Sequence, residues 1–303
     1  MVSRPDVLRA SARIAERVRH TPVLEVFEPG PLLLKLEFLQ HSGSFKARGA
    51  FNRVLAAAES GELTDTGVIA ASGGNAGLAF GYAAAVVGVP AEVYVPQTAP
   101  AVKVAKLRAL GATVVQHGRE YVAAYEAARK RQAETGAVFC HPYDQPEVVA
   151  GQGTVALELP AVDTVLVAVG GGGLVSGIAA ALEGRSRVVG VEPESCPTLH
   201  AALVAGEPVD VPVGGVAADS LGARRLGEIA FQVVTRCAVA SLLVSDEVIV
   251  AARRDLWDRY RIVVEHGAAT AWAALFTGGY RPQPGERVAV VLCGANTDPA
   301  DLG

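Results

Sequence analysis

Short apolar runs alternate with segments of helical spacing along nearly the whole chain. An apolar run bounded by turn residues predicts a buried strand, whereas apolar residues three or four positions apart predict a helix with one buried face. We therefore expect strands within residues 31–39, 67–72, 91–95, 113–116, 162–169, 187–191 and 287–292. Helices are expected after Lys46 and near residues 79–86, 100–110, 120–134, 174–182, 198–204, 246–260 and 268–276.

This alternation predicts an α/β fold in which parallel sheets carry helices on both faces. The 303 residues suffice for about two domains with a large core. No Pro/Ser-rich linker divides the chain, and no internal repeat is visible. We therefore expect an α/β protein in which two sheets share one chain.

Composition excludes several classes of partner. Half of the residues are apolar, the mean hydropathy is positive and the formal net charge is −4. The chain has no basic stripe, so we expect no nucleic-acid partner. Residues 1–20 lack the apolar centre of a secretory signal, and Asp6 and Glu16 argue against a transit peptide. The longest apolar stretch, residues 76–90, is too short and too rich in glycine to span a bilayer, so we expect a soluble protein with no membrane partner.

The cysteines and histidines point to no metal or disulfide framework. Cys140, Cys196, Cys237 and Cys293 lie far apart without Cys-x-x-Cys spacing, which suits a reducing compartment. The six histidines form no metal-ligand pair at helical spacing. We expect a cytoplasmic location.

Lys46 is the first candidate for chemistry, because it stands where an extended segment gives way to a helix. Ser42 and Ser44 can cap the N-terminus of that helix. The positive end of a helix disfavours an ammonium, and burial lowers the pKa of a lysine further. A neutral lysine can form a Schiff base or act as a base. The alternative is a surface lysine whose amine reaches water.

A loop of four consecutive glycines follows a buried strand and opens a helix. Such a loop lets a ligand approach the backbone and aims several N–H groups at one point, which predicts a phosphate site. A structural turn is one alternative. A dinucleotide site in an NAD-binding oxidoreductase is another, with Gly171, Gly173 and Gly177 near the phosphates and Glu192 on a ribose hydroxyl. That alternative leaves Lys46 without a role.

A second loop, residues 71–77, again joins a strand to a helix. Its Ser72 hydroxyl, its Asn75 amide and its backbone N–H groups are donors that suit a carboxylate. A phosphate, a carbonyl that condenses with Lys46 and a carboxylate together describe a phosphorylated aldehyde with an amino acid substrate. Pyridoxal phosphate (PLP) is such an aldehyde.

The chain resembles the fold-type II PLP enzymes, specifically the serine/threonine dehydratase (threonine ammonia-lyase) family, and its motifs are closest to liver-type serine dehydratases. The resemblance rests on residues 20–22, 34–37, 40–49, 96–100, 151–154 and the tetraglycine, all in order. It implies a tryptophan synthase β-subunit-like fold of two lobes, each a mostly parallel twisted sheet flanked by helices, with the active site between them. Residues 44–138 would form the small lobe, and residues 1–43 and 139–303 the larger, cofactor-binding lobe.

The resemblance also implies a role for individual residues. Lys46 would carry the Schiff base, Phe45 would stack on the cofactor ring, Asn75 would bind the ring hydroxyl and Ser220 would lie near the other face. The cofactor phosphate would lie on Gly170, Gly171, Gly172 and Gly173, and the substrate carboxylate on Ser72, Gly73, Asn75 and Ala76. Cys293 would face the pyridine nitrogen; a thiol does not hold that nitrogen protonated, which favours elimination. Without the resemblance, Cys293 is interpreted as a small buried apolar residue.

The expected reaction is dehydration and deamination of L-serine and/or L-threonine to a 2-oxo acid and ammonia, with Lys46 as the base. A β-replacement reaction of the cysteine synthase type is the alternative. Related racemases carry a serine as second base where this chain has Gly73, which argues against racemisation. The segment Val264-Glu265-His266 departs from the Val-Glu-Pro usual in the family, so the pocket wall and the preferred substrate stay open.

The family often binds a cation near the phosphate loop. Glu192 matches its carboxylate ligand, and carbonyls of Cys196, Leu221 and Ala223 would complete the site. Thr198 stands where divalent-binding relatives have an aspartate, which favours K⁺. A carboxylate that is satisfied at a strand end is the alternative for Glu192. The resemblance further implies a homodimer, and because the chain ends soon after Asn296 we expect no regulatory domain.

Overall fold

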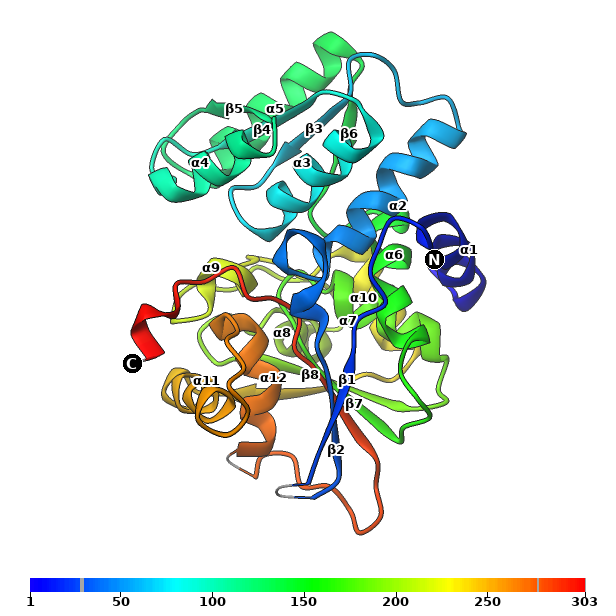
Figure 1. Ribbon diagram of the computed structural model, residues 1–303, viewed down its shortest axis with the longest axis vertical. Helices are drawn as coiled ribbons and strands as arrows, with labels where there is room; N and C mark the ends of the chain where they lie inside the picture. Colours follow the sequence, from blue (N-terminus) through cyan, green and yellow to red (C-terminus); the bar gives the residue numbers. More distant parts are fainter. Residues whose placement is uncertain (28–29, 277, 303) are drawn as a thin grey trace.

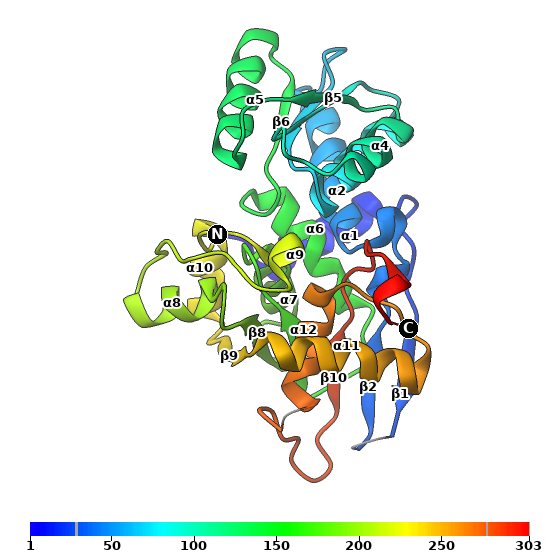
Figure 2. The same ribbon diagram turned by 90° about the vertical axis from the view of Figure 1, so that its left-hand side faces the viewer.

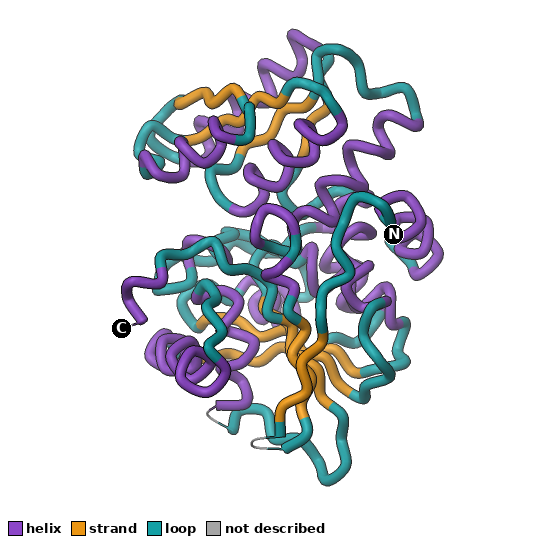
Figure 3. Tube along the Cα trace, viewed as in Figure 1, coloured by secondary structure: helices purple, strands orange, loops and turns teal. Residues whose placement is uncertain are grey.

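The computed structural model describes residues 1–27, 30–276 and 278–302. It has two lobes, each built on its own sheet (Figures 1 and 3). The small lobe holds a parallel four-stranded sheet in the order β5-β4-β3-β6. Its strands are β3 (Val68–Ala71), β4 (Ala91–Val95), β5 (Thr113–Gln116) and β6 (Val138–Cys140).

Helices cover both faces of the small sheet, as the alternation of side chains along a strand requires. Val68 and Ala70 pack in one cluster with α3 (Asn75–Val87) and α4 (Ala101–Ala109), whereas Ile69 and Ala71 pack in another with α5 (Tyr121–Thr135). The predicted parallel sheet between helices is confirmed for this lobe.

The larger lobe holds a six-stranded sheet in the order β1-β2-β10-β7-β8-β9, parallel except for the β1–β2 pair. Its strands are β1 (Val23–Val26), β2 (Leu32–Lys35), β7 (Thr164–Ala168), β8 (Arg187–Pro193), β9 (Ala240–Val244) and β10 (Val288–Val291). Its helices are α1 (Arg4–Ile14), α6 (Pro146–Leu157), α7 (Gly173–Leu182), α8 (Thr198–Ala205), α9 (Ala218–Leu221), α10 (Glu228–Arg236), α11 (Asp246–Tyr260) and α12 (His266–Phe276). Figure 2 shows the small lobe standing above this one.

Helix α2 (Lys46–Glu59) joins the lobes, because it contacts both α3 and α6. Strand β6 pairs with β3, so the small sheet continues to Cys140, beyond the limit of 138 expected for the small lobe. The segment after β6 then returns to the larger lobe at α6. The chain thus passes between the lobes twice, at α2 and after β6, and these two passages bring sequence-distant residues together.

One predicted strand is shorter than expected, and several elements were not predicted. The strand expected over residues 31–39 ends at Lys35, and η1 (Glu37–Leu39) follows, because Glu37 turns inward to a buried arginine. Helix α6 was not predicted, since Gly151 and Gly153 weaken its helical signal. Those glycines allow close packing: a Cβ at Gly151 would lie 2.7 Å from the Arg48 carbonyl oxygen. Elements α1, α9, α10, β1, β6 and β9 were also not predicted.

None of the helices that the structure describes is long and apolar enough to reach across a membrane.

Candidate active site

Lys46 is the first residue of α2, and the loop before it is held by the end of β10. Phe45, not a serine, is the N-cap, and no side chain caps this helix. The hydroxyls of Ser42 and Ser44 are buried and have no hydrogen-bond partner in the described part of the chain, so the predicted capping was wrong. Instead, the Phe45 N–H donates to the Cys293 carbonyl at 2.9 Å.

The Lys46 amine lies inside the site rather than in bulk water. Its Nζ donates to the Pro142 carbonyl oxygen at 2.8 Å and lies 5.0 Å from the centroid of the Phe45 ring. Burial lowers the pKa of Lys46 to about 8, although Cys293 and Glu265 act in the opposite direction. An amine with this pKa is available as a nucleophile or base near neutral pH, and the alternative of a surface lysine is wrong.

The segment from His141 to Asp144 aims the Pro142 carbonyl at Lys46. His141 Nδ1 accepts the N–H groups of Tyr143 at 3.3 Å and Asp144 at 2.8 Å. Burial lowers the pKa of His141 to about 4, so the imidazole is neutral and can accept. Sequence reasoning missed this turn, because nothing local links His141 to a lysine so distant in the chain.

The tetraglycine loop is shaped by its protein neighbours. A Cβ at Gly171 would lie 2.4 Å from the Tyr143 ring, and one at Gly170 would lie 3.0 Å from the Leu221 Cα. Gly172, the N-cap of α7, has a φ of 88°, in the left-handed region that favours glycine. Packing and backbone conformation therefore account for these glycines without any ligand.

The same loop nevertheless leaves donors available. Within the described residues, the backbone N–H groups of Gly170, Gly171, Gly172 and Gly173 donate to no protein acceptor. They stand at the N-terminus of α7, where unpaired N–H groups and the helix dipole favour an anion. The arrangement has the chemistry of a phosphate site.

The second loop lies at the end of β3 and the start of α3, and its tight turn is set by Gly77. A Cβ at Gly77 would lie 1.9 Å from the Ser72 carbonyl oxygen. The Ser72 hydroxyl accepts the Gly74 N–H at 3.3 Å. Gly73 and Ala76 lie in the same turn, so the proposed carboxylate binders are brought together.

Asn75 connects this loop to the larger lobe. Its Nδ2 donates to Glu265 Oε1 at 2.8 Å, and its Oδ1 accepts Asn296 Nδ2 at 2.8 Å. Both polar groups of the amide are therefore engaged with protein. A ligand hydroxyl could reach Asn75 only by sharing or replacing these partners.

Glu265 is a site residue that the sequence marked only as a departure from a motif. It is 7% exposed, and burial raises its pKa to about 7. It accepts from Asn75 and contributes to the electrostatics of Lys46. A Cβ at Gly294 would lie 2.5 Å from Glu265 Oε1, so a glycine after β10 makes room for this carboxylate.

Cys293 and Ser220 reach the same region from β10 and α9. Cys293 is buried, and burial raises the pKa of its thiol, which stays protonated at ordinary pH. A Cβ at Gly267 would lie 2.2 Å from the Ser220 Oγ, so α12 and α9 meet at this hydroxyl. Lys46, Asn75, Cys293 and Ser220 are thus gathered from four separate elements.

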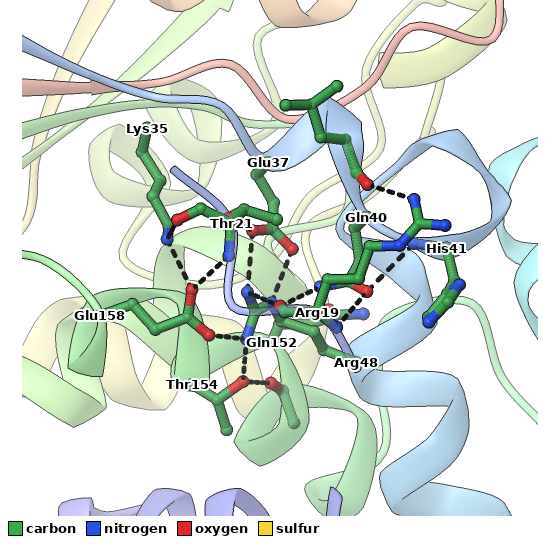
Figure 4. A network of polar contacts seen from close by, with 12 residues as sticks. Arg19, Thr21, Lys35, Glu37, Gln40, His41, Arg48, Gln152, Thr154 and Glu158 are labelled. Carbon is green, nitrogen blue, oxygen red and sulfur yellow. Dashed lines mark hydrogen bonds and ion pairs between the residues drawn. The ribbon is translucent and has the colours of Figure 1, made fainter. Parts of the chain in front are cut away.

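A buried ionic network holds the first turn of α2 to the larger lobe (Figure 4). Arg48 uses all five of its N–H groups. Nε and Nη2 donate to the two oxygens of Glu37 at 2.6 and 2.9 Å, and Nη1 donates to Glu158 at 2.6 Å. The remaining contacts are to Thr154 Oγ1 and the Arg19 carbonyl. Lys35 donates to Glu158 at 2.5 Å, which balances two cations with two carboxylates.

Glu192 is fully buried at the end of β8 and faces the N-terminus of α8. One carboxylate oxygen accepts the N–H of Leu199 at 2.7 Å, the other that of His200 at 2.9 Å. The hydroxyls of Thr198 and Ser241 add two weaker contacts. Burial raises the pKa of Glu192 to about 7, and no lysine or arginine in the described part of the chain pairs with it. Both oxygens of Glu192 thus accept backbone N–H groups at the start of α8.

Comparison with known proteins identifies the class. Residues 14–294 match the family described as pyridoxal-phosphate dependent enzymes, and the chain belongs to that family. It is 36% identical over 310 residues to an L-threonine ammonia-lyase of Thermotoga maritima, with 98% of this chain and 76% of that protein covered. It is 38% identical over 303 residues to a phenylserine dehydratase of Ralstonia pickettii, with 95% and 91% covered.

Solved structures show the same architecture. The chain superimposes on maize serine racemase with a TM-score of 0.92 at 30% identity, covering 99% of this chain and 95% of that one. For the serine racemase of Dictyostelium discoideum the TM-score is 0.90 at 31% identity, covering 98% and 99%. The predicted fold class and the predicted family are therefore confirmed.

Proposed function

We propose that this protein is a PLP-dependent lyase that dehydrates and deaminates L-serine and/or L-threonine to a 2-oxo acid and ammonia. The observation that carries the proposal is the Lys46 amine, held in the interior with a pKa lowered to about 8 and hydrogen-bonded to Pro142, whose neighbour Tyr143 packs on the tetraglycine loop. Relatives named threonine ammonia-lyase and threonine dehydratase, at 36% and 34% identity, support this reaction.

The residues present fit PLP. We assign Gly170, Gly171, Gly172 and Gly173 to the phosphate, because their N–H groups lack acceptors among the described residues. Phe45 would pack on the ring, Asn75 would bind the ring hydroxyl, Cys293 would face the ring nitrogen and Ser220 would lie on the other side. When bound, PLP supplies an electron sink for the charge that develops at the substrate Cα.

Lys46 would hold the cofactor aldehyde in the resting enzyme, and its amine would be the base that takes the substrate Cα proton. The Pro142 carbonyl, at 2.8 Å, orients the amine for this step. The substrate carboxylate would lie on Ser72, Gly73, Asn75 and Ala76, at the positive end of α3. The proton acceptor would thus come from α2 and the carboxylate site from the loop between β3 and α3.

Elimination is favoured over transamination and racemisation by two residues. The Cys293 thiol stays neutral and cannot act as the carboxylate that would keep a ring nitrogen protonated. Gly73 offers no second base, although space exists there: its Cβ would meet Val95 Cγ1 at an ordinary 3.4 Å. With Lys46 as the single base, the proton is removed from one face of the substrate and not returned on the other. This arrangement suits loss of the β-hydroxyl.

A K⁺ ion near Glu192 is part of the proposal. A buried carboxylate with a pKa raised to about 7 and no cationic side chain beside it in the described residues gains from a bound cation. The carbonyls of Cys196 and Leu221 each accept one backbone N–H and so keep a lone pair; Ala223 would be the further ligand. Replacing K⁺ with Na⁺ or Li⁺ should lower turnover and the melting temperature together. If neither changes, Glu192 only caps α8.

We further propose a homodimer in the cytoplasm. Four free cysteines, two of them fully buried, suit a reducing compartment, and the family resemblance implies the dimer. Light scattering of the purified protein measures its mass in solution; a mass equal to one chain at micromolar concentration contradicts the dimer.

The decisive experiment is a panel of amino acids assayed for 2-oxo acid release. We expect release from L-serine or L-threonine without any added nucleophile. If a product forms only when a thiol is added, the enzyme catalyses β-replacement instead. Lys46→Ala should abolish both turnover and borohydride-stable attachment of PLP, because the amine that would carry the cofactor is then removed.

A further inference from the structure

An ion pair connects the two lobes at the edge of the site. Lys103 belongs to α4 of the small lobe, and Asp219 belongs to α9 of the larger lobe. The Lys103 ammonium pairs with the Asp219 carboxylate. In both ribbon views α4 stands above α9 across the space between the lobes (Figures 1 and 2).

Asp219 marks the boundary between the site and the solvent. A Cβ on Gly74 of the second loop would lie 3.8 Å from the Asp219 carbonyl oxygen, and its neighbour Ser220 contacts Gly267. Its negative charge also contributes to the raised pKa of Glu265. Its side chain, by contrast, is 64% exposed. The pair therefore joins the two lobes next to the loop at Gly74 and to Ser220.

We propose that Lys103 and Asp219 form a latch that holds the lobes together over the bound amino acid. The ion pair with Lys103 holds Asp219 against the small lobe. The backbone of Asp219 lies next to the loop at Gly74 and is continuous with Ser220, so the ion pair can influence both. Because the pair is partly exposed, it adds little to the stability of the fold. The ion pair instead shifts the equilibrium between open and closed arrangements of the lobes toward the closed one. It therefore strengthens substrate binding.

The latch is a positioning device; neither residue is assigned a chemical step. Removing one charge with Lys103→Gln should raise KM about 1.5- to 5-fold, the range expected for an exposed pair, with kcat changed less. Raising salt from about 0.05 M to about 0.5 M should raise the KM of the wild type and leave that of Lys103→Gln unchanged. The melting temperature should stay the same.

Charge reversal gives the sharper test. Lys103→Asp and Asp219→Lys each place like charges together and should raise KM more than Lys103→Gln does, whereas the double variant should recover most of the loss. Arg131→Gln is the matched control, because Arg131 pairs with Glu92 at 3.0 Å with similar exposure but within the small lobe. If the double variant does not recover, or if Arg131→Gln raises KM equally, the latch is wrong.

The KM measurements rest on the proposed function, whereas a second measurement does not depend on it. Amide hydrogen exchange in residues 216–222 should be faster in Lys103→Asp than in the wild type, and normal again in the double variant. If the wild type releases no 2-oxo acid from any amino acid, the proposed function fails while the exchange result still decides the latch. Equal exchange in all three proteins would overturn the latch, whatever the activity.

Discussion

Single residues set the proton chemistry of this site through burial rather than through charged neighbours. Burial is the main cause of the lowered pKa of Lys46 and of the raised pKa of Glu265, with values of about 8 and 7. The two groups approach each other in pKa, as expected of a buried amine and carboxylate that share one pocket. Their titration should therefore be visible in the pH dependence of the reaction.

The pH profile tests this directly. With substrate bound, the Lys46 amine accepts a proton only when it is neutral, so kcat should rise with pH and level off above about 8. Glu265→Gln removes a negative charge that raises the pKa of Lys46, so the rising limb should move to lower pH. A limb that stays in place would mean that Glu265 does not act on Lys46, and Glu286→Gln, remote from the site, is the control.

Gly73 offers a test of the single-base assignment. Gly73→Ser adds a hydroxyl in a space that accommodates a Cβ at 3.4 Å from Val95. We expect formation of the D-amino acid to increase relative to 2-oxo acid, measured by chiral chromatography. Gly73→Ala should fold equally well without this gain. D-amino acid formation that is equal in both variants would show that the hydroxyl is not a base here.

At the scale of elements, α2 is fixed in place by its buried ionic network and by close helix packing. Arg48 is 1% exposed and lies two residues after Lys46 in the first turn of α2. A Cβ on Gly49 would lie 2.8 Å from the Val148 carbonyl oxygen, so α2 and α6 approach through a glycine. Together these contacts determine how α2 presents its first residue to the site.

Breaking this network should be costly. Arg48→Met leaves Glu37 and Glu158 buried without their main partner, which destabilises a protein by about 3–5 kcal/mol. We expect a lower urea midpoint with an unchanged slope. Adding Glu37→Leu to Arg48→Met should recover part of the loss, because the unpaired buried charge is then removed. If the double variant is no more stable than the single one, the loss comes from packing and not from charge.

At the scale of the whole molecule, the site exists only because two sheets meet around α2 and the segment after β6. The tetraglycine and Cys293 come from the larger lobe and the carboxylate loop from the small lobe, so a ligand between them joins both (Figure 1). A ligand that binds only the folded state stabilises it by mass action.

Removing the cofactor should therefore loosen the whole chain. With PLP at about 100 times its dissociation constant, the gain in unfolding free energy is about 2.7 kcal/mol. The apo-protein should melt at a lower temperature and regain the difference when PLP is added. Lys46→Ala should keep only part of this gain, since the phosphate contacts remain. Equal melting temperatures with and without PLP would contradict the assigned cofactor site.

The sequence by itself determined the fold class and the family, and it marked the candidate residues for the chemistry. Apolar periodicity predicted most of the strands, and β4 and β5 begin and end where expected, because buried strands depend on local hydrophobic pattern. Lys46 and the two glycine loops were recognised as candidates because each interrupts the apolar periodicity of the strands and helices.

Tertiary structure alone decided how those residues meet. Nothing near Lys46 in the sequence indicates that its partner is the Pro142 carbonyl, that Glu265 binds Asn75, or that Tyr143 lies on the tetraglycine loop. The capping by Ser42 and Ser44 was wrong for the same reason. Burial and long-range contacts, which fix pKa values and hydrogen-bond partners, arise only when the two lobes have folded together.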